Sequence, residues 1–142
     1  MTYQIRKAAV LGAGVMGAAI AAHLANVGIP SLLLDIVPTG QVQDRNIIAR
    51  SGLEKILKAK PAAFYTKQSA QLVTIGNIED DLSKLADVDW IVEAVIERSD
   101  IKQNLYNKIE SVLDNRQGTD LSYPIISSNT SGIPAHSLLA GR

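Results

Sequence analysis

Short apolar runs alternate along the chain with longer stretches whose apolar residues recur at helical spacing. A continuous apolar run suits a parallel strand that is buried on both faces, and the stretches between the runs suit helices that cover the sheet. The pattern predicts an α/β fold of the Rossmann type, a doubly wound and mainly parallel sheet with helices on both faces. We expect strands at 8–11, 32–34, 72–77, 90–97 and 124–128, and helices at 15–27, 41–60, 80–85, 100–113 and from Pro134 onward.

The first strand–helix–strand unit contains the most informative motif of the sequence. Three glycines follow the first apolar run, Gly12, Gly14 and Gly17, and the alanine-rich stretch after them leads to a second apolar run closed by Asp35. Strand, glycine turn, helix, strand and acid in this order are typical of a dinucleotide-binding unit. The alternative is a buried strand–helix–strand unit that binds no ligand.

Each part of this motif has a physical role in holding a dinucleotide. Gly12 can adopt a tight turn, Gly14 leaves room for the main chain to contact a pyrophosphate, and Gly17 lets the helix lie close to the strand. The first helical turn presents unpaired N–H groups and the positive end of the helix dipole, which stabilise a phosphate without any lysine. Asp35 can accept hydrogen bonds from ribose hydroxyls and would repel a 2′-phosphate. No arginine follows Asp35 directly, so the predicted cofactor is NAD rather than NADP.

Composition narrows the class of protein. The 142 residues correspond to one domain, 46% are hydrophobic, and the formal net charge is zero, so no nucleic-acid partner is expected. The chain has no cysteine, which excludes disulfides and thiolate catalysis and is compatible with the cytoplasm, the predicted location. No apolar run has the length of about 18 residues that a membrane-spanning helix needs. No metal site is predicted.

Three of the predicted loops are expected to meet at one edge of the sheet, because right-handed crossovers place the C-terminal ends of parallel strands on the same side. These loops are 11–16, 94–102 and 127–132. The predicted helix 41–60 carries a positively charged set of residues, Arg45, Arg50, Lys55, Lys58 and Lys60. This set is either a solvated face or a source of attraction for an anionic substrate.

Three motifs occur in order along the chain: GAGVMG at 12–17, VEAVIE at 92–97 and SNTS at 128–131. Together they resemble the NAD-binding domain of L-3-hydroxyacyl-CoA dehydrogenases, most weakly over 41–77 and 115–123. The long segment after Asp35 resembles the bacterial fatty-acid β-oxidation enzymes of that family, FadN-like and FadB-like members included. The resemblance implies oxidation of an (S)-3-hydroxyacyl-CoA to a 3-ketoacyl-CoA, with hydride transfer to NAD.

The resemblance also implies roles for individual residues. Ser131 would lie near both the nicotinamide and the substrate oxygen, with Asn129 in support, and Asp35 would bind the adenosine ribose. The general base of the family is a histidine in a HFFNP-type motif, which this sequence does not contain; His136 falls in the predicted last helix and is not a substitute. The residues expected to bind the cofactor are Gly12, Gly14, Val15, Met16, Gly17, Asp35, Ala94, Glu97, Lys102, Asn129 and Ser131.

The sequence stops directly after a helical start, so we expect an N-terminal fragment in which 1–142 form the NAD-binding domain. The family's helical substrate and dimerisation domain would be absent, and the fragment alone is expected to be inactive. The full-length protein would bind an acyl-CoA substrate and form a dimer or a complex. Two alternatives stay open: the cofactor domain of another NAD-dependent hydroxyacid or nucleotide-sugar dehydrogenase, and a non-catalytic NAD-sensing module. As a further alternative, Glu97 and Ser131 would be strand-end capping residues with no ligand.

Overall fold

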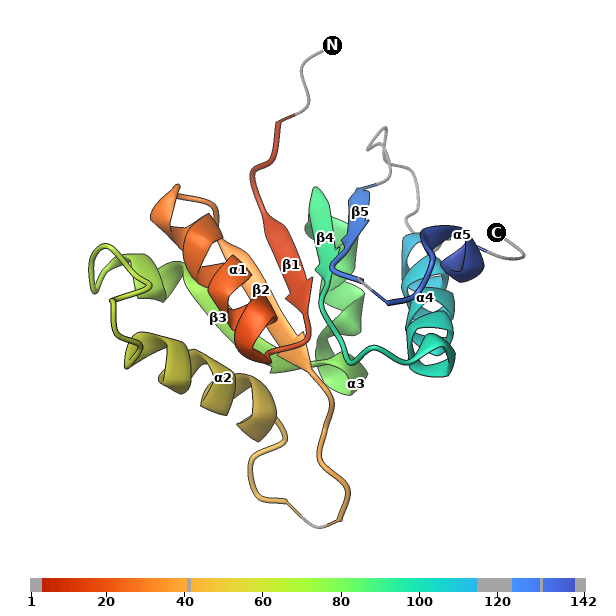
Figure 1. The fold of residues 1–142 in the computed structure, drawn as a ribbon, viewed down its shortest axis with the longest axis horizontal. Helices are drawn as coiled ribbons and strands as arrows, with labels where there is room; N and C mark the ends of the chain where they lie inside the picture. The colour runs from red at the N-terminus through yellow and green to blue at the C-terminus, as the bar shows by residue number, and fades with distance from the viewer. Residues whose placement is uncertain (1–3, 41, 115–123, 131, 140–142) are drawn as a thin grey trace.

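The computed structural model describes residues 4–40, 42–114, 124–130 and 132–139. These residues form a five-stranded sheet in the order β3-β2-β1-β4-β5, and every neighbouring pair of strands is parallel (Figure 1). The strands are β1 (Ala8–Leu11), β2 (Ser31–Asp35), β3 (Val73–Asn77), β4 (Trp90–Glu93) and β5 (Ile125–Ser128). The predicted Rossmann-type fold is confirmed.

Helices cover both faces of this sheet. They are α1 (Val15–Asn26), α2 (Ile47–Leu57), α3 (Ile78–Asp81), α4 (Ser99–Asp114) and α5 (Ala135–Leu138), with 3₁₀ segments η1 (Ser69–Leu72) and η2 (Leu82–Asp87). Alternate strand residues pack into two separate cores, because successive side chains point to opposite faces. Ala8 and Val10 belong to the core under α1 and α2, whereas Ala9 and Leu11 belong to the core under η2 and α4. Figure 1 shows the same two layers, with α1 and α2 on one side of the sheet and α4 on the other.

The strand register places the ends of β1, β2, β4 and β5 at one edge of the sheet. Leu11 lies opposite Leu34 of β2 and Glu93 of β4, and Glu93 lies opposite Ser128 of β5. The loops that follow these strands therefore start side by side, as predicted from the topology. None of the described helices is both long and apolar enough to cross a bilayer.

The fourth strand is shorter than predicted, because it ends at Glu93 and not at Glu97. Its last ladder bond joins the amide of Ala94 to the carbonyl of Leu11, at 2.7 Å. Beyond this point β1 has turned away at Gly12 and β5 has ended at Ser128, so neither neighbour continues the ladder. The apolar run of the sequence outlasts the strand, and Glu97 lies in the loop between β4 and α4.

Two helical predictions also differ from the structure. The helix predicted at 41–60 begins only at Ile47, since the carboxylate of Asp44 accepts the amide of Asn46 at 3.0 Å in a turn ahead of it. The helix predicted at 80–85 is two short segments, α3 and η2. The first of these starts earlier than predicted because the side chain of Asn77 caps it, accepting the amide of Asp80 at 2.7 Å.

Candidate cofactor site

The glycine turn between β1 and α1 is held in a space too small for side chains. Gly12 has a φ of +108°, and a β-carbon there would lie 2.4 Å from the carbonyl oxygen of Ala94. A β-carbon on Gly17 would lie 1.7 Å from the carbonyl oxygen of Gly12. Gly14 differs from both, because nothing lies within 4 Å of its β-carbon position. The turn is therefore packed tightly from behind and open in front.

The open side of the turn is the N-terminal end of α1. Gly14 is the N-cap, no side chain caps this end, and the first turn of the helix holds no acidic residue. The side chains of Val15 and Met16 point away from the core, with 86% and 54% of their surfaces exposed. Main-chain N–H groups at the start of a helix lack intrahelical partners and lie at the positive end of its dipole. This end of α1 can therefore hold a diphosphate.

Asp35 joins the glycine turn to the end of β2. Its Oδ2 accepts the amide of Ala13 at 2.7 Å, and its Oδ1 accepts the amide of Ile36 at 2.7 Å. Each carboxylate oxygen can accept more than one hydrogen bond. Asp35 can therefore stabilise the turn and still accept bonds from the hydroxyls of a ribose.

A cleft of about 860 Å³ extends from the turn between α2, the loop after β4 and α4. Helix α2 can lie close to the turn because Gly52 has no side chain. A β-carbon there would lie 2.2 Å from the carbonyl oxygen of Ala13. The cleft has the size of a small-molecule site, and its walls are mainly apolar with a few polar residues among them. Its walls include Ile48 and Ile56 of α2, Val95 and Ile96 of the loop, and Ile101 and Leu105 of α4. Such a cleft can accept a flat apolar ring system beside the carboxylate of Asp35.

The family model described as 3-hydroxyacyl-CoA dehydrogenase, NAD binding domain, matches residues 7–141. The match includes the glycine turn, Asp35 and the loops after β4 and β5. The chain belongs to this family. Membership in the family confirms the recognition made from the three motifs and NAD as the cofactor.

The relatives of this chain are similar to it over almost its whole length. A Deinococcus radiodurans protein named probable 3-hydroxyacyl-CoA dehydrogenase is 55% identical over 98% of this chain and 38% of its own length. A Rickettsia felis protein named putative fatty acid oxidation complex trifunctional enzyme is 38% identical over 94% of this chain and 18% of its own length. The crystal structure of FadB2 from M. tuberculosis has a TM-score of 0.71 at 27% identity, over 96% of this chain and 45% of that chain. The chain thus spans less than half of each of these proteins.

Some of the residues predicted to bind the cofactor line the cleft, and others do not. Those that line the cleft are Gly12, Gly14, Val15, Asp35 and Ala94. Met16, Gly17, Glu97, Lys102 and Asn129 do not line it. The amide of Asn129 donates to the carbonyl of Glu93 at 2.8 Å, so Asn129 directly continues the β4–β5 edge. Ser131 lies outside the described residues.

The side chain of Lys102 points into the interior of the protein. Only 1% of its surface is exposed, and its Nζ lies 3.0 Å from Oε2 of Glu93 and 3.3 Å from Oε1 of Glu97. Its predicted role along the cofactor would therefore operate through these carboxylates and the loop that carries them.

Three residues that surround Lys102 were not predicted from the sequence: Glu93, Tyr106 and Ser128. Glu93 has no exposed surface, and its carboxylate also accepts from the hydroxyls of Tyr106 at 2.9 Å and Ser128 at 2.7 Å. We call Glu93, Lys102, Tyr106 and Ser128 the Glu93 cluster. The sequence carried a signal for it, since Glu93 is an acid inside an otherwise apolar strand and a buried carboxylate needs partners.

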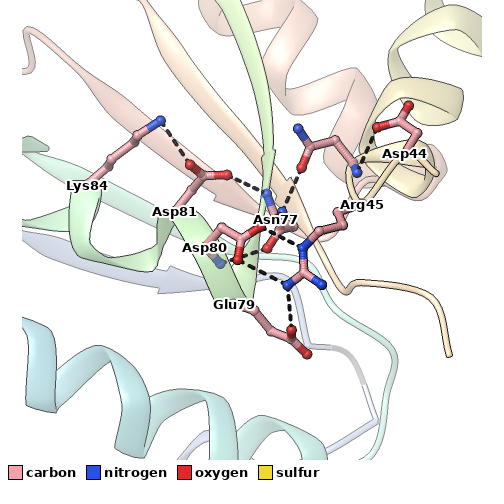
Figure 2. Close-up of polar contacts among 8 residues, drawn as sticks. Asp44, Arg45, Asn77, Glu79, Asp80, Asp81 and Lys84 are labelled. Carbon is pink, nitrogen blue, oxygen red and sulfur yellow. Dashed lines mark hydrogen bonds and ion pairs between the residues drawn. The ribbon is translucent and has the colours of Figure 1, made fainter. Parts of the chain in front are cut away.

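A second cluster of polar side chains surrounds the start of α2, the helix that forms one wall of the cleft (Figure 2). Arg45 donates to Asp80 at 2.8 Å and to Glu79 at 2.9 Å, and the buried side-chain amide of Asn77 donates to Asn46 at 2.7 Å. Part of the positively charged set predicted on this helix is thus paired with acids. Arg50 contacts Asp44 at 2.7 Å, whereas Lys55 lines the cleft.

The ion pair between Arg45 and Asp80 predicts that the free energy of unfolding of the protein falls in acid by the contribution of this pair. Hydrogen bonding to Arg45 lowers the pKa of Asp80 from 3.8 to about 2. A carboxyl with a lowered folded-state pKa contributes stability above its unfolded value and loses it as the pH falls through the folded value. We therefore expect this contribution at pH 5, and its loss between about pH 4 and pH 2. Denaturant unfolding of the wild type and Asp80→Asn across this range measures it: the two proteins should converge in stability toward pH 2. Parallel curves would contradict the assignment to Asp80.

Proposed function

We propose that the full-length protein oxidises (S)-3-hydroxyacyl-CoA to 3-ketoacyl-CoA, and that this chain supplies the part that binds NAD. The single observation that supports the proposal best is the uncapped start of α1 beside Asp35, at the mouth of the apolar cleft. It offers a diphosphate, a ribose and an adenine their separate partners within one site. NAD held there by the start of α1 and by Asp35 would supply the hydride acceptor for oxidation of the hydroxyl-bearing carbon of the substrate.

We assign the parts of the cofactor to elements of the chain as follows. The main-chain amides of Val15 and Met16 would hold the diphosphate, Asp35 would hold the adenosine ribose, and Ala94 would lie along the cofactor on its way to the end of β5. There Asn129 is followed closely by Ser131, which we propose as the contact to the substrate oxygen. This direction follows from the order of the strands, because β4 lies between β1 and β5.

The proposed reaction needs a base that removes the proton of the substrate hydroxyl. Neither His23 of α1 nor His136 of α5 lines the cleft, and both are exposed. We therefore propose the histidine of the family's HFFNP-type motif as the base. Inactivity of this chain alone, the acyl-CoA partner, the assembly into a dimer or complex and the cytoplasmic location all stay predictions.

The proposal is tested by adding 3-hydroxyacyl-CoA substrates of several chain lengths to the full-length gene product and following NADH formation. We expect NADH with (S)-3-hydroxyacyl-CoA and none with the free 3-hydroxy acid or with a nucleotide sugar. No NADH from any acyl-CoA would sink the proposal. Turnover of the free acid or the nucleotide sugar would favour the other dehydrogenase alternatives.

Asp35 should decide the choice between NAD and NADP. Its carboxylate would accept the ribose hydroxyls of NAD and repel the 2′-phosphate of NADP. Asp35→Ala should weaken NAD by about 1–3 kcal/mol, because a hydrogen-bonded polar group loses its partner. It should also lower the ratio of NAD affinity to NADP affinity at least about tenfold. The ratio is the useful quantity in calorimetry, since any loosening of the turn at Ala13 affects both cofactors alike. A ratio that does not change would contradict this role.

A further inference from the structure

The Glu93 cluster lies directly beneath the two loops that follow β4 and β5. Oε2 of Glu93 accepts the main-chain amide of Val95 at 3.0 Å, in the loop after β4. Oε1 accepts the hydroxyl of Ser128 at 2.7 Å, on the last residue of β5. One carboxylate therefore bonds both to the loop after β4 and to the residue from which the loop after β5 starts, while Lys102 and Tyr106 hold it from α4.

Burying this carboxylate and the ammonium of Lys102 needs a reason other than stability. A buried ion pair contributes little more than a well-packed apolar pair of the same volume, since both charges must lose their water. An apolar side chain at position 93 could fill the space but could accept nothing from Val95 or Ser128. What the carboxylate adds is a fixed relation between the two loops.

The contacts continue outward from the cluster into the same loops. Nζ of Lys102 also contacts Glu97 at 3.3 Å, and the carboxylate of Glu97 accepts the hydroxyl of Thr130. Thr130 in turn donates its amide to Oγ of Ser128 at 3.3 Å. These contacts form a closed ring through the residues Glu93, Ser128, Thr130, Glu97 and Lys102. Glu93 joins this ring to the cleft wall at Val95.

We infer that Glu93 is a positioning residue that sets the distance between the loop after β4 and the loop after β5. This inference rests on the proposed function, in which the first loop guides the cofactor and the second contacts the substrate. Glu93 touches neither ligand and acts through Ser128 and Val95. Hydride transfer is sensitive to such spacing, because a misplacement of about 1 Å can cost about a hundredfold in rate.

Two hydroxyls on the same carboxylate oxygen provide a matched test in the full-length gene product. Ser128→Ala removes the hydroxyl that leads to the loop after β5, whereas Tyr106→Phe removes one that α4 carries. We expect Ser128→Ala to lower kcat at least about tenfold with less change in the KM for NAD. Tyr106→Phe, with a similar loss in Tm, should lower kcat less than about twofold. Equal losses of kcat, or losses that follow Tm in both variants, would overturn the inference.

Hydrogen exchange separates failure of this inference from failure of the proposed function. If the wild type forms no NADH from any acyl-CoA, the proposed function is wrong, and the loops are then judged by exchange alone. Ser128→Ala should speed amide exchange at 94–98 and 129–130 at least about tenfold over Tyr106→Phe. Equal exchange in the two variants would overturn the inference whatever the activity.

Discussion

Gly17→Ala should lower the affinity for NAD at least about a hundredfold, equivalent to about 2.8 kcal/mol of binding free energy. The added β-carbon would lie 1.7 Å from the carbonyl oxygen of Gly12. The main chain of the turn must therefore move, and the N–H groups at the start of α1 lose their common direction. Overpacking of this kind also costs typically about 1–3 kcal/mol of stability. Calorimetry with NAD and thermal unfolding measure the two effects.

Gly14→Ala is the matched control for this prediction. Nothing lies within 4 Å of the added methyl group, so the fold should tolerate it and the free energy of unfolding should change by less than about 0.5 kcal/mol. The methyl group would nevertheless occupy the open side of the turn, where we place the diphosphate. Weaker NAD binding at unchanged stability is therefore expected. Normal NAD binding by Gly17→Ala would contradict the packing of the turn.

Lys102→Met should be among the most destabilising single substitutions in the domain. The Glu93 carboxylate would stay buried without its cation, and breaking a buried pair in this way costs about 3–5 kcal/mol. The double variant Glu93→Gln/Lys102→Met should recover much of this loss, because no fully buried charge is then left unpaired. Urea unfolding of the wild type, both single variants and the double variant gives the coupling between the two residues.

An exposed ion pair on the same stretch of chain is the control for Lys102. Arg98 and Asp100 approach to 2.8 Å, closer than Lys102 and Glu93, but their side chains are 63% and 66% exposed. Arg98→Met should cost less than about 1 kcal/mol, because water screens the pair and solvates the remaining charge. Equal costs for Arg98→Met and Lys102→Met would show that burial does not govern these pairs.

The parts of the fold that the sequence predicted well are those set by local chemistry. The apolar runs of β1, β2 and β4 form buried strands because their side chains must leave water, whereas β5 is mostly exposed. Gly12 marks the end of β1 because only glycine fits there. Asp35 closes β2 and lines the cleft as the spacing of the motif predicts. The sequence marks these features through residues that lie close together along the chain.

The features that sequence reasoning missed depend on neighbours that are distant in the sequence. The end of β4 at Glu93 is set by β1, which turns away about eighty residues earlier. The inward direction of Lys102 is set by a carboxylate on another element, and the spacing of the VEAVIE motif does not reveal which of its two acids is buried. The hydrogen bond to the side chain of Asn46, just ahead of α2, likewise comes from Asn77, far along the chain in β3.

The central place of β1 has a consequence for the order in which the molecule assembles. Newly made chain can join β1 to β2 early, since only the intervening helix separates them, but β4 reaches β1 only after residue 93 has been added. Gly12 rests against Ala94, so the packing of its turn is incomplete until that late contact forms. The complete lining of the cofactor cleft therefore forms only after synthesis has passed Ala94, and we expect NAD to stabilise the chain fully only from that point.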